Sequence, residues 1–254
     1  MKRKTAPAST ATARLIVMAL LALAASGAQA QTVQHVSPVA GFYSKYVDCE
    51  GIPIRSSDVV DDTALRQACG KVAMMLKGIP AAKERLIQRG AELHVIGRDQ
   101  QTSDLPEFRD QRGKTYVDNT GRSTTIDERT RGKGGLKASC GEENILHLSS
   151  DRYRDGSDIC IHEFAHTIMT FGFTQEQRAR IIDQYRRSLA KGLWQNAYGA
   201  VDPREFWAEL SMWYFGSHGA HRKDGPQLAD GPQGLKAYDP DAYDLLNRLY
   251  HGGG

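Results

Sequence analysis

Two histidines and a glutamate lie close together in an otherwise apolar stretch, residues 157–173 (SDICIHEFAHTIMTFGF). They form the pattern His162-Glu163-x-x-His166. On a helix, residues four positions apart lie on one face, about a turn from each other. Two neutral imidazoles at that spacing can bind one zinc ion, and Glu163 can take a proton from water that the metal makes nucleophilic. The pattern therefore predicts a metal-dependent hydrolytic site with Glu163 as general base.

The residues around the motif favour the helix that such a site needs. Ser157 or Asp158 can cap its start, and Gly172 can end it in a left-handed conformation. Five apolar residues can bury the rest of the helix: Ile159, Ile161, Phe164, Ala165 and Ile168. Two core histidines beside a chance glutamate are the alternative, but at average composition the fixed pattern arises in only about 1% of chains of this length. We therefore favour zinc.

A zinc site on two histidines needs a third protein ligand. The three-histidine pattern HExxHxxGxxH fails, because Met169 and Gly172 occupy its glycine and last histidine positions. Glu205 and Glu209, in PREFWAEL, are four apart on one expected helix and can face the same point. One can bind the metal while the other accepts the second N–H of a zinc histidine; the alternative is a solvated acidic edge. Three other glutamates are weaker candidates: Glu142, Glu143 and Glu176.

The motif HEFAH, followed by YGAVDPREFWAEL at residues 198–210, resembles the catalytic domains of anthrax lethal factor and the Pro-Pro endopeptidases, within the glutamate-liganded zinc peptidases (gluzincins). In that family a tyrosine precedes the zinc glutamate by seven residues and an acidic residue follows it by four. The resemblance, over roughly residues 145–254, implies that Glu205 binds the metal and Glu209 orients a histidine. It also implies that Tyr198 donates to the oxyanion, although an ordinary half-buried tyrosine is the alternative.

The first 30 residues are typical of a secretory signal peptide, with a basic start, an apolar run at 15–25 and a small-x-small site ending at Ala30. The apolar run is shorter than the ~20 residues that span a bilayer. These residues carry four of the 33 Lys and Arg and none of the 30 Asp and Glu, so cleavage changes the net charge from +3 to −1. We expect a secreted or periplasmic protein, free of the membrane after cleavage, favoured as a monomer and without a nucleic-acid partner.

Four cysteines follow the expected signal peptide, and export makes disulfides possible. Of the three pairings, we favour Cys49 with Cys69 and Cys140 with Cys160, which close the short loops. Each bond is worth roughly 3 kcal/mol on the chain-entropy model. Zinc-binding thiols are the poorer alternative, because the chain has no CxxC pair. A bond between Cys140 and Cys160 would tether the glycine-rich stretch before Cys140 to the motif helix.

The remaining pattern predicts mostly helix with few strands, hence an α+β domain. Helices are expected to start at Asp61 or Asp62, near residue 81, at Thr174, at Asp202-Pro203 and at Asp239 or Asp241. Strands are expected at residues 91–97 and 144–149, and irregular chain at 31–60, 98–141 and 216–238. The resemblance implies a zincin-like domain with a small mixed sheet. We expect one domain at 31–254, with 31–140 as its N-terminal part and 141–254 as its catalytic core.

These observations predict a secreted zinc metallopeptidase that holds one Zn²⁺ and hydrolyses peptide or protein substrates. A zinc hydrolase of a non-peptide amide, such as a cell-wall component, and a non-catalytic metal-binding protein are the alternatives. The stretch RGKGG at 131–135 can form a lid, border a substrate-binding edge strand, which residues 144–149 would supply, or be disordered.

Overall fold

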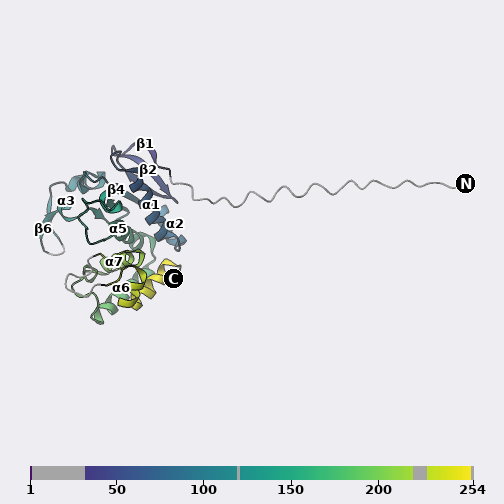
Figure 1. The fold of residues 1–254 in the computed structure, drawn as a ribbon, viewed down its shortest axis with the longest axis vertical. Coiled ribbons are helices and arrows are strands. Elements are labelled where there is room, and N and C mark those ends of the chain that lie inside the picture. Colours follow the sequence, from purple (N-terminus) through teal and green to yellow (C-terminus); the bar gives the residue numbers. More distant parts are fainter. Residues whose placement is uncertain (2–31, 119–120, 220–227, 253–254) are drawn as a thin grey trace. The chain divides into compact units, whose positions relative to one another are not determined.

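A computed structural model describes residues 1, 32–118, 121–219 and 228–252 of the chain (Figure 1). The expected signal peptide and its cleavage site lie outside these residues. Residues 31–254 form one compact unit by their contacts. Within the described ranges, no helix is both long enough and apolar enough to cross a membrane.

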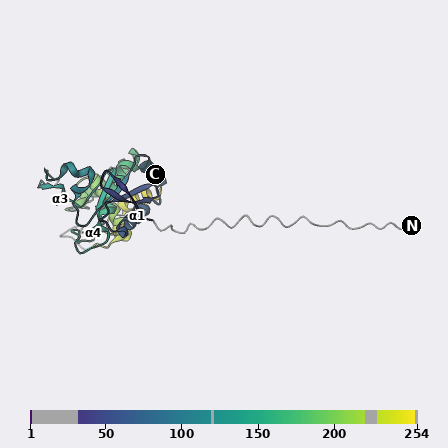
Figure 2. The same cartoon turned by 90° about the horizontal axis from the view of Figure 1, so that it is seen from above.

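The main sheet is mixed, with six strands in the order β1-β2-β3-β4-β8-β7. Strands β3, β4 and β8 are parallel to one another, and the other pairs are antiparallel. The strands are β1 Gln34–Val39, β2 Tyr43–Cys49, β3 Ile52–Ser56, β4 Glu92–Ile96, β7 Gly132–Lys133 and β8 Lys137–Gly141. A separate hairpin is formed by β5 Thr115–Val117 and β6 Ser123–Thr125. This hairpin and the neighbouring α3 lie at one end of the unit (Figure 1, Figure 2).

Helices make up about half of the described chain. They are α1 Asp62–Leu76, α2 Pro80–Gln88, α3 Ile126–Arg129, α4 Glu142–Ile145, α5 Ile159–Thr167, α6 Gln175–Ala190, α7 Pro203–Phe215, α8 Gly231–Tyr238 and α9 Pro240–Tyr250. Short helical turns lie at η1 Thr102–Asp104, η2 Pro106–Gln111, η3 Ile168–Gly172 and η4 Tyr198–Ala200. The α+β class with a small mixed sheet is thus confirmed.

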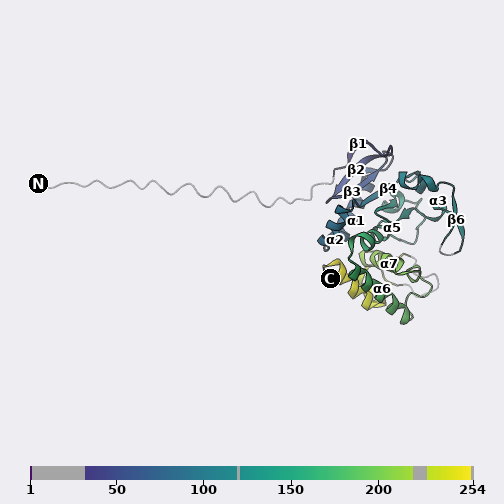
Figure 3. The ribbon, with the colours of Figure 1, turned by 180° about the vertical axis from the view of Figure 1, so that it is seen from behind.

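Helix α5, which carries the HEFAH motif, lies at the centre of this arrangement. It packs against β8 on one side and against α7 on the other, and both views along the shortest axis place it between the sheet and α7 (Figure 1, Figure 3). Phe164, Ala165 and Ile168 are fully buried in the core. Trp207 of α7 donates from its indole nitrogen to the carbonyl of Ala165 at 2.9 Å. The helix is therefore held rigidly on its apolar faces.

Several helix boundaries agree with the sequence. Asp61 caps α1, Thr174 and Gln177 form the capping box of α6, and Asp202 caps α7 ahead of its first-turn proline. Gly172, by contrast, does not end the motif helix in a left-handed conformation. Helix α5 continues into the π turn η3, and a Cβ added at Gly172 would meet side chains of α2 at ordinary contact distances of 3.4 Å and more.

The irregular chain expected at residues 31–60 is wrong, because β1, β2 and β3 lie there. Glu50 and Gly51 both have positive φ, at 53° and 93°, and form the tight turn between β2 and β3. Pro53 pairs with β2 and precedes the part of β3 that pairs with β4. Gly51 and Pro53, residue types that usually interrupt regular structure, therefore lie within a hairpin here.

Three other expected segments also differ. Residues 144–149 do not form a strand: they fall in α4 and the turn after it, where the amide of Leu148 donates to the carbonyl of Glu143 at 2.8 Å. The chain at 98–141 contains several short elements, including the last two strands of the sheet. The chain at 216–238 contains α8, although residues 220–227 lie outside the described part.

Candidate metal centre

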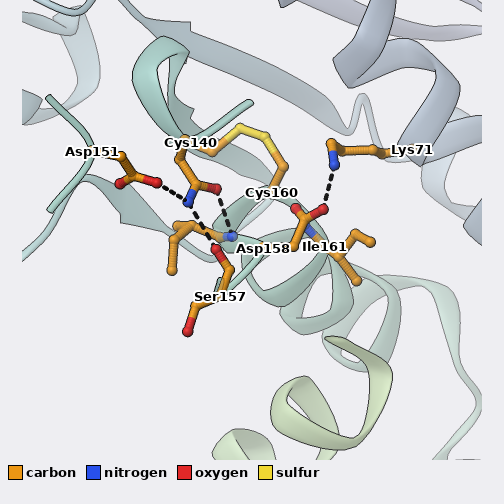
Figure 4. Close-up of a disulfide and its surroundings, with 9 residues drawn as sticks. Lys71, Cys140, Asp151, Ser157, Asp158, Cys160 and Ile161 are labelled. Carbon is orange, nitrogen blue, oxygen red and sulfur yellow. Dashed lines mark hydrogen bonds and ion pairs between the residues drawn. A yellow bond between two sulfur atoms is a disulfide. The ribbon is translucent and has the colours of Figure 1, made fainter. Parts of the chain in front are cut away.

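The first turn of α5 is fixed by contacts from several parts of the chain. The side chain of Asp158 accepts from the amide of Ile161 at 3.1 Å and is ion-paired with Lys71. The side chain of Asn144 accepts from the amide of Ile159 at 2.9 Å and donates to the carbonyl of Ser157 at 2.8 Å. Figure 4 shows these bonds beside a disulfide that enters the same turn. Together they determine where the polar face of α5 points.

The disulfide in Figure 4 joins Cys140 on β8 to Cys160 on α5, and a second joins Cys49 to Cys69. The expected pairing of cysteines is therefore confirmed. Cys140 lies opposite Gly132 in the pairing of β8 with β7. The bond thus links the helix to the strand next to the glycine-rich segment.

Three side chains from α5 and α7 place their ligand-type atoms in a tight triangle. Nε2 of His162 lies 3.3 Å from Nε2 of His166 and 3.2 Å from Oε2 of Glu205. The remaining side, from Nε2 of His166 to Oε2 of Glu205, is 3.4 Å. Ligand atoms that bind zinc at about 2.0–2.2 Å in a tetrahedron lie about 3.3–3.5 Å apart. The donor set and its spacing therefore fit a tetrahedral metal ion with one position open.

The second carboxylate of α7 lies behind this triangle. Oε1 of Glu209 is 3.0 Å from Nδ1 of His162, the nitrogen that faces away from the other ligand atoms. A proton on Nδ1 leaves the lone pair of Nε2 available to a metal. Glu205 and Glu209 thus contact different nitrogens of His162, as expected for one ligand and one orienting residue.

The electrostatics of the cluster favour a cation. Burial of His162 opposes its charge, but hydrogen bonds to Glu205 and Glu209 hold the pKa of the imidazole well above its usual value. Burial of Glu205 opposes its ionisation, but hydrogen bonds from His162 and His166 hold the pKa of this carboxyl well below its usual range. The cluster is therefore strongly polarised to hold positive charge between its carboxylates.

Glu163 lies beside the triangle and forms a looser set with the histidines. Ligand-type atoms of His162, Glu163 and His166 all lie within 4.8 Å of one another. The carboxylate of Glu205 lies closer to both imidazoles, at 3.2 and 3.4 Å, and therefore fits a third ligand position better than Glu163 does. Glu163 is then close enough to act on a group held at the open position.

The glycine-rich segment 132–135 passes directly over the polar face of α5. A Cβ added to Gly132 would lie 3.0 Å from Cγ of Glu163, and one added to Gly134 would lie 2.6 Å from Cβ of His166. Neither glycine has a positive φ, so it is the close approach that requires the missing side chains. Sequence reasoning placed a possible edge strand at 144–149, whereas the edge strand beside the motif helix is β7.

Arg131 and Glu143 hold this segment through an ion pair that the sequence did not predict. Arg131 donates twice to the carboxylate of Glu143, from Nε at 2.6 Å and from Nη2 at 2.8 Å. Both side chains are almost completely buried. Glu143 was weighed only as a metal ligand, and Asn144 only as part of a strand. The available signal was the polar run Glu142-Glu143-Asn144 between Cys140 and the apolar pair Ile145-Leu146, because polar residues that are buried among apolar ones need partners.

Tyr198 lies on η4, ahead of α7, with 38% of its surface exposed. The centre of its ring is 6.2 Å from that of His162. The phenol oxygen accepts a hydrogen bond from Nη2 of Arg129 at 3.3 Å. The structure thus brings Tyr198 to the cluster formed by α5 and α7.

A cleft of about 690 Å³ opens over the cluster. It is lined by the motif side chains, by segment 132–135 and by residues of the β5–β6 hairpin, including Tyr116 and Val117. Such a volume is typical of ligand sites. Glu163 and the three side chains of the triangle are therefore all accessible from one cleft.

Other residues of ligand type lie elsewhere or have other partners. Glu142 pairs with Arg98, and Glu176 pairs with Arg180 on the surface. His218 lines the cleft and contacts the carbonyl of Leu228. The histidines at positions 35, 94, 147 and 251 are not part of the cluster, and position 221 lies outside the described residues.

Comparison with protein-family models finds no match for this chain, and comparison with curated proteins finds none either.

Proposed function

We propose that this chain is an exported zinc metallopeptidase. The observation that carries the proposal is the triangle of His162, His166 and Glu205, whose sides of 3.2–3.4 Å suit a tetrahedral metal site with an open position. The resemblance of HEFAH and residues 198–210 to the gluzincins supports the same reading. The two disulfides are typical of proteins that fold in an oxidising compartment.

Three polar residues of the cleft then have distinct tasks: Glu163, Tyr198 and Glu209. When bound, zinc supplies the Lewis acidity that makes water nucleophilic near neutral pH and polarises a carbonyl. Glu163 takes a proton from the attacking water and transfers it to the nitrogen of the leaving amine. Tyr198 donates to the oxygen of the attacked carbonyl as negative charge develops there. Glu209 keeps the imidazole of His162 in one tautomer and one orientation.

An extended peptide suits the cleft as its substrate. Strand β7 is the last strand of the sheet, and Gly132 and Lys133 line the cleft. A peptide can add a further strand at such an edge through main-chain hydrogen bonds. Because Gly132 lies against Glu163, a bond paired there would pass close to the general base.

Zinc content and peptide cleavage test this proposal together. The purified protein should contain one zinc per chain and cleave members of a mixed peptide library, and a chelator should abolish cleavage. Glu163→Gln should retain the zinc and lose turnover, whereas Glu176→Gln, an exposed change on α6, should retain both. Tyr198→Phe should lower kcat by about 10²-fold.

Three results would contradict the proposal in different ways. Full turnover by Glu163→Gln would refute the mechanism. Cleavage of cell-wall fragments but of no peptide would indicate a hydrolase of non-peptide amides. Zinc binding without cleavage of either substrate class would indicate a metal-binding protein without catalytic activity.

A further inference from the structure

Arg129, the last residue of the short helix α3, lines the cleft, and hydrogen bonds hold this helix in place. Thr125 and Glu128 form a capping box around α3. The carboxylate of Asp127 accepts from the amide and the hydroxyl of Ser103 at 2.8 and 2.7 Å. The short helix therefore gives Arg129 a fixed starting point, although four residues alone would not form a stable helix.

The guanidinium of Arg129 is oriented by two partners. Its Nε lies 3.6 Å from Oδ2 of Asp118, whose side chain is only 4% exposed. Its Nη2 donates to the phenol oxygen of Tyr198 at 3.3 Å, and its Cζ lies 5.9 Å from the centre of the tyrosine ring. Burial opposes the charge on Arg129, but Tyr198 and Asp118 raise its pKa, so the side chain remains a cation.

The backbone next to Tyr198 is held by contacts with Tyr185 and Trp194. The hydroxyl of Tyr185 donates to the carbonyl of Ala200 at 2.7 Å, and Gly199 lies so close to Trp194 that an added Cβ would meet its ring at 2.7 Å. The phenol end reaches Arg129, which is 69 residues away in the sequence. The position of the phenol thus depends on a contact between two distant segments.

The direction of this hydrogen bond matters for chemistry. Arginine has five N–H donors and no acceptor, so the phenol oxygen of Tyr198 is the acceptor in the bond with Arg129. The phenol hydrogen is then the only one that Tyr198 can donate, and a cation beside the oxygen makes that hydrogen a stronger donor. Both effects suit a group that must donate to a developing negative charge.

We infer that Arg129 is a positioning residue of the cleft, which holds the phenol of Tyr198 as a hydrogen-bond donor beside His162. This inference rests on the proposed peptidase function for its effect on rate. The contact itself does not depend on that function. Arg129 would therefore affect the rate of turnover through Tyr198, without binding the ground-state substrate.

A double-mutant cycle with a matched control tests the effect on rate. Arg129→Met should lower kcat by about 10-fold with KM within about twofold, and Arg129→Lys should recover part of the loss. In a Tyr198→Phe background, Arg129→Met should change kcat by less than about twofold, because the interaction is already absent. Arg122→Met is the control: Arg122 is 68% exposed, lies 4.0 Å from the same Asp118 and should leave kcat unchanged. Losses that multiply in the double variant would overturn the inference.

A second readout decides the contact independently of catalysis. In protein labelled with ¹³C in the rings of its ten tyrosines, the Tyr198 resonance is identified by its loss in Tyr198→Phe. It should shift in Arg129→Met and stay in place in Arg122→Met, with or without added zinc. If the Tyr198 resonance does not shift in Arg129→Met, the inference is wrong even in an active peptidase. A shifted resonance in a chain that cleaves no peptide would support the contact and contradict the proposed function alone.

Discussion

Replacing Gly134 by alanine tests whether the close approach of segment 132–135 to α5 determines the metal centre. The change adds one methyl group and alters no ligand. Gly134 does not have a positive φ, so alanine is compatible with its backbone conformation. The added Cβ would lie 2.6 Å from Cβ of His166 and 2.9 Å from two atoms of its ring. The methyl group therefore presses directly on one member of the ligand triangle.

The size of the effect follows from these distances. Ordinary carbon contacts begin at 3.4 Å, so the segment and His166 must move apart by about 0.8 Å. Metal–ligand distances tolerate only about ±0.2 Å. If His166 takes up most of the movement, the affinity for zinc should fall by about 10- to 100-fold, as when residues that support a ligand are lost. If the segment moves instead, overpacking should still cost about 1–3 kcal/mol of stability.

The neighbouring glycine supplies the control. A Cβ on Gly135 would meet nothing closer than the carbonyl oxygen of Lys137, at 3.7 Å. Gly135→Ala should therefore keep the affinity of the wild-type protein. Zinc affinity is measured by competition with a chromophoric chelator, and stability by urea unfolding of the zinc-free proteins. Equal zinc affinity and equal stability in Gly134→Ala and Gly135→Ala would refute the contact between the segment and the ligand.

Three further predictions concern the groups that support the cleft. Glu143→Gln should lower the free energy of unfolding, measured in urea, by about 3 kcal/mol, because it leaves the buried Arg131 without its counter-charge. Glu176→Gln on the surface should lower it by less than about 1 kcal/mol. Equal losses in the two variants would contradict the role of burial. Burial opposes the charge on His94, but two carboxylates within 3.0 Å raise the pKa of His94, and their own pKa values are lowered. The stability lost in His94→Gln should therefore be greatest between about pH 4.5 and 6.5, and should decline both as pH rises through the raised pKa of His94 and as the carboxylates are protonated in acid. A loss of stability that grows above pH 7 would contradict this prediction. Replacing Cys140 and Cys160 by alanine should cost roughly 3 kcal/mol of stability and also weaken zinc binding. Replacing Cys49 and Cys69, which are equally far apart in sequence, should cost similar stability and leave the zinc affinity unchanged. Equal zinc affinities in the two variants would contradict a role of the Cys140–Cys160 bond in positioning α5.

The helices could be predicted because their signals are local. Asp61 before α1, Thr174 with Gln177 at α6 and Asp202 before Pro203 at α7 are caps that act within one turn. The apolar residues that follow each cap repeat at helical spacing. Local signals therefore sufficed for these three helices, including α7, which carries Glu205 and Glu209.

The strand expected at 91–97 is confirmed as β4, but the other strands and the supports of the cleft could not be predicted in the same way. Strand β7 has only two residues, and its place depends on pairing with β8. Arg131, just before it, donates to the carbonyl of Gly97, 34 residues earlier. Asn144 looked like the start of a strand, but its side chain caps a helix that begins 15 residues later. These contacts join distant parts of the chain, and no periodic pattern in the sequence indicates them.

The glycines that obscured β7 in the sequence also explain why an edge strand can serve this cleft. A strand next to a helix is normally kept away by its own side chains, at about 10 Å between layers. Gly132 and Gly134 have none, so the backbone reaches Glu163 and His166 within contact distance. A peptide paired to the outer edge of β7 would then lie one strand spacing, about 4.8 Å, further across the cleft. The glycines in the irregular chain expected at 98–141 are thus what would allow the backbone of a peptide substrate to come near Glu163 and the proposed metal together.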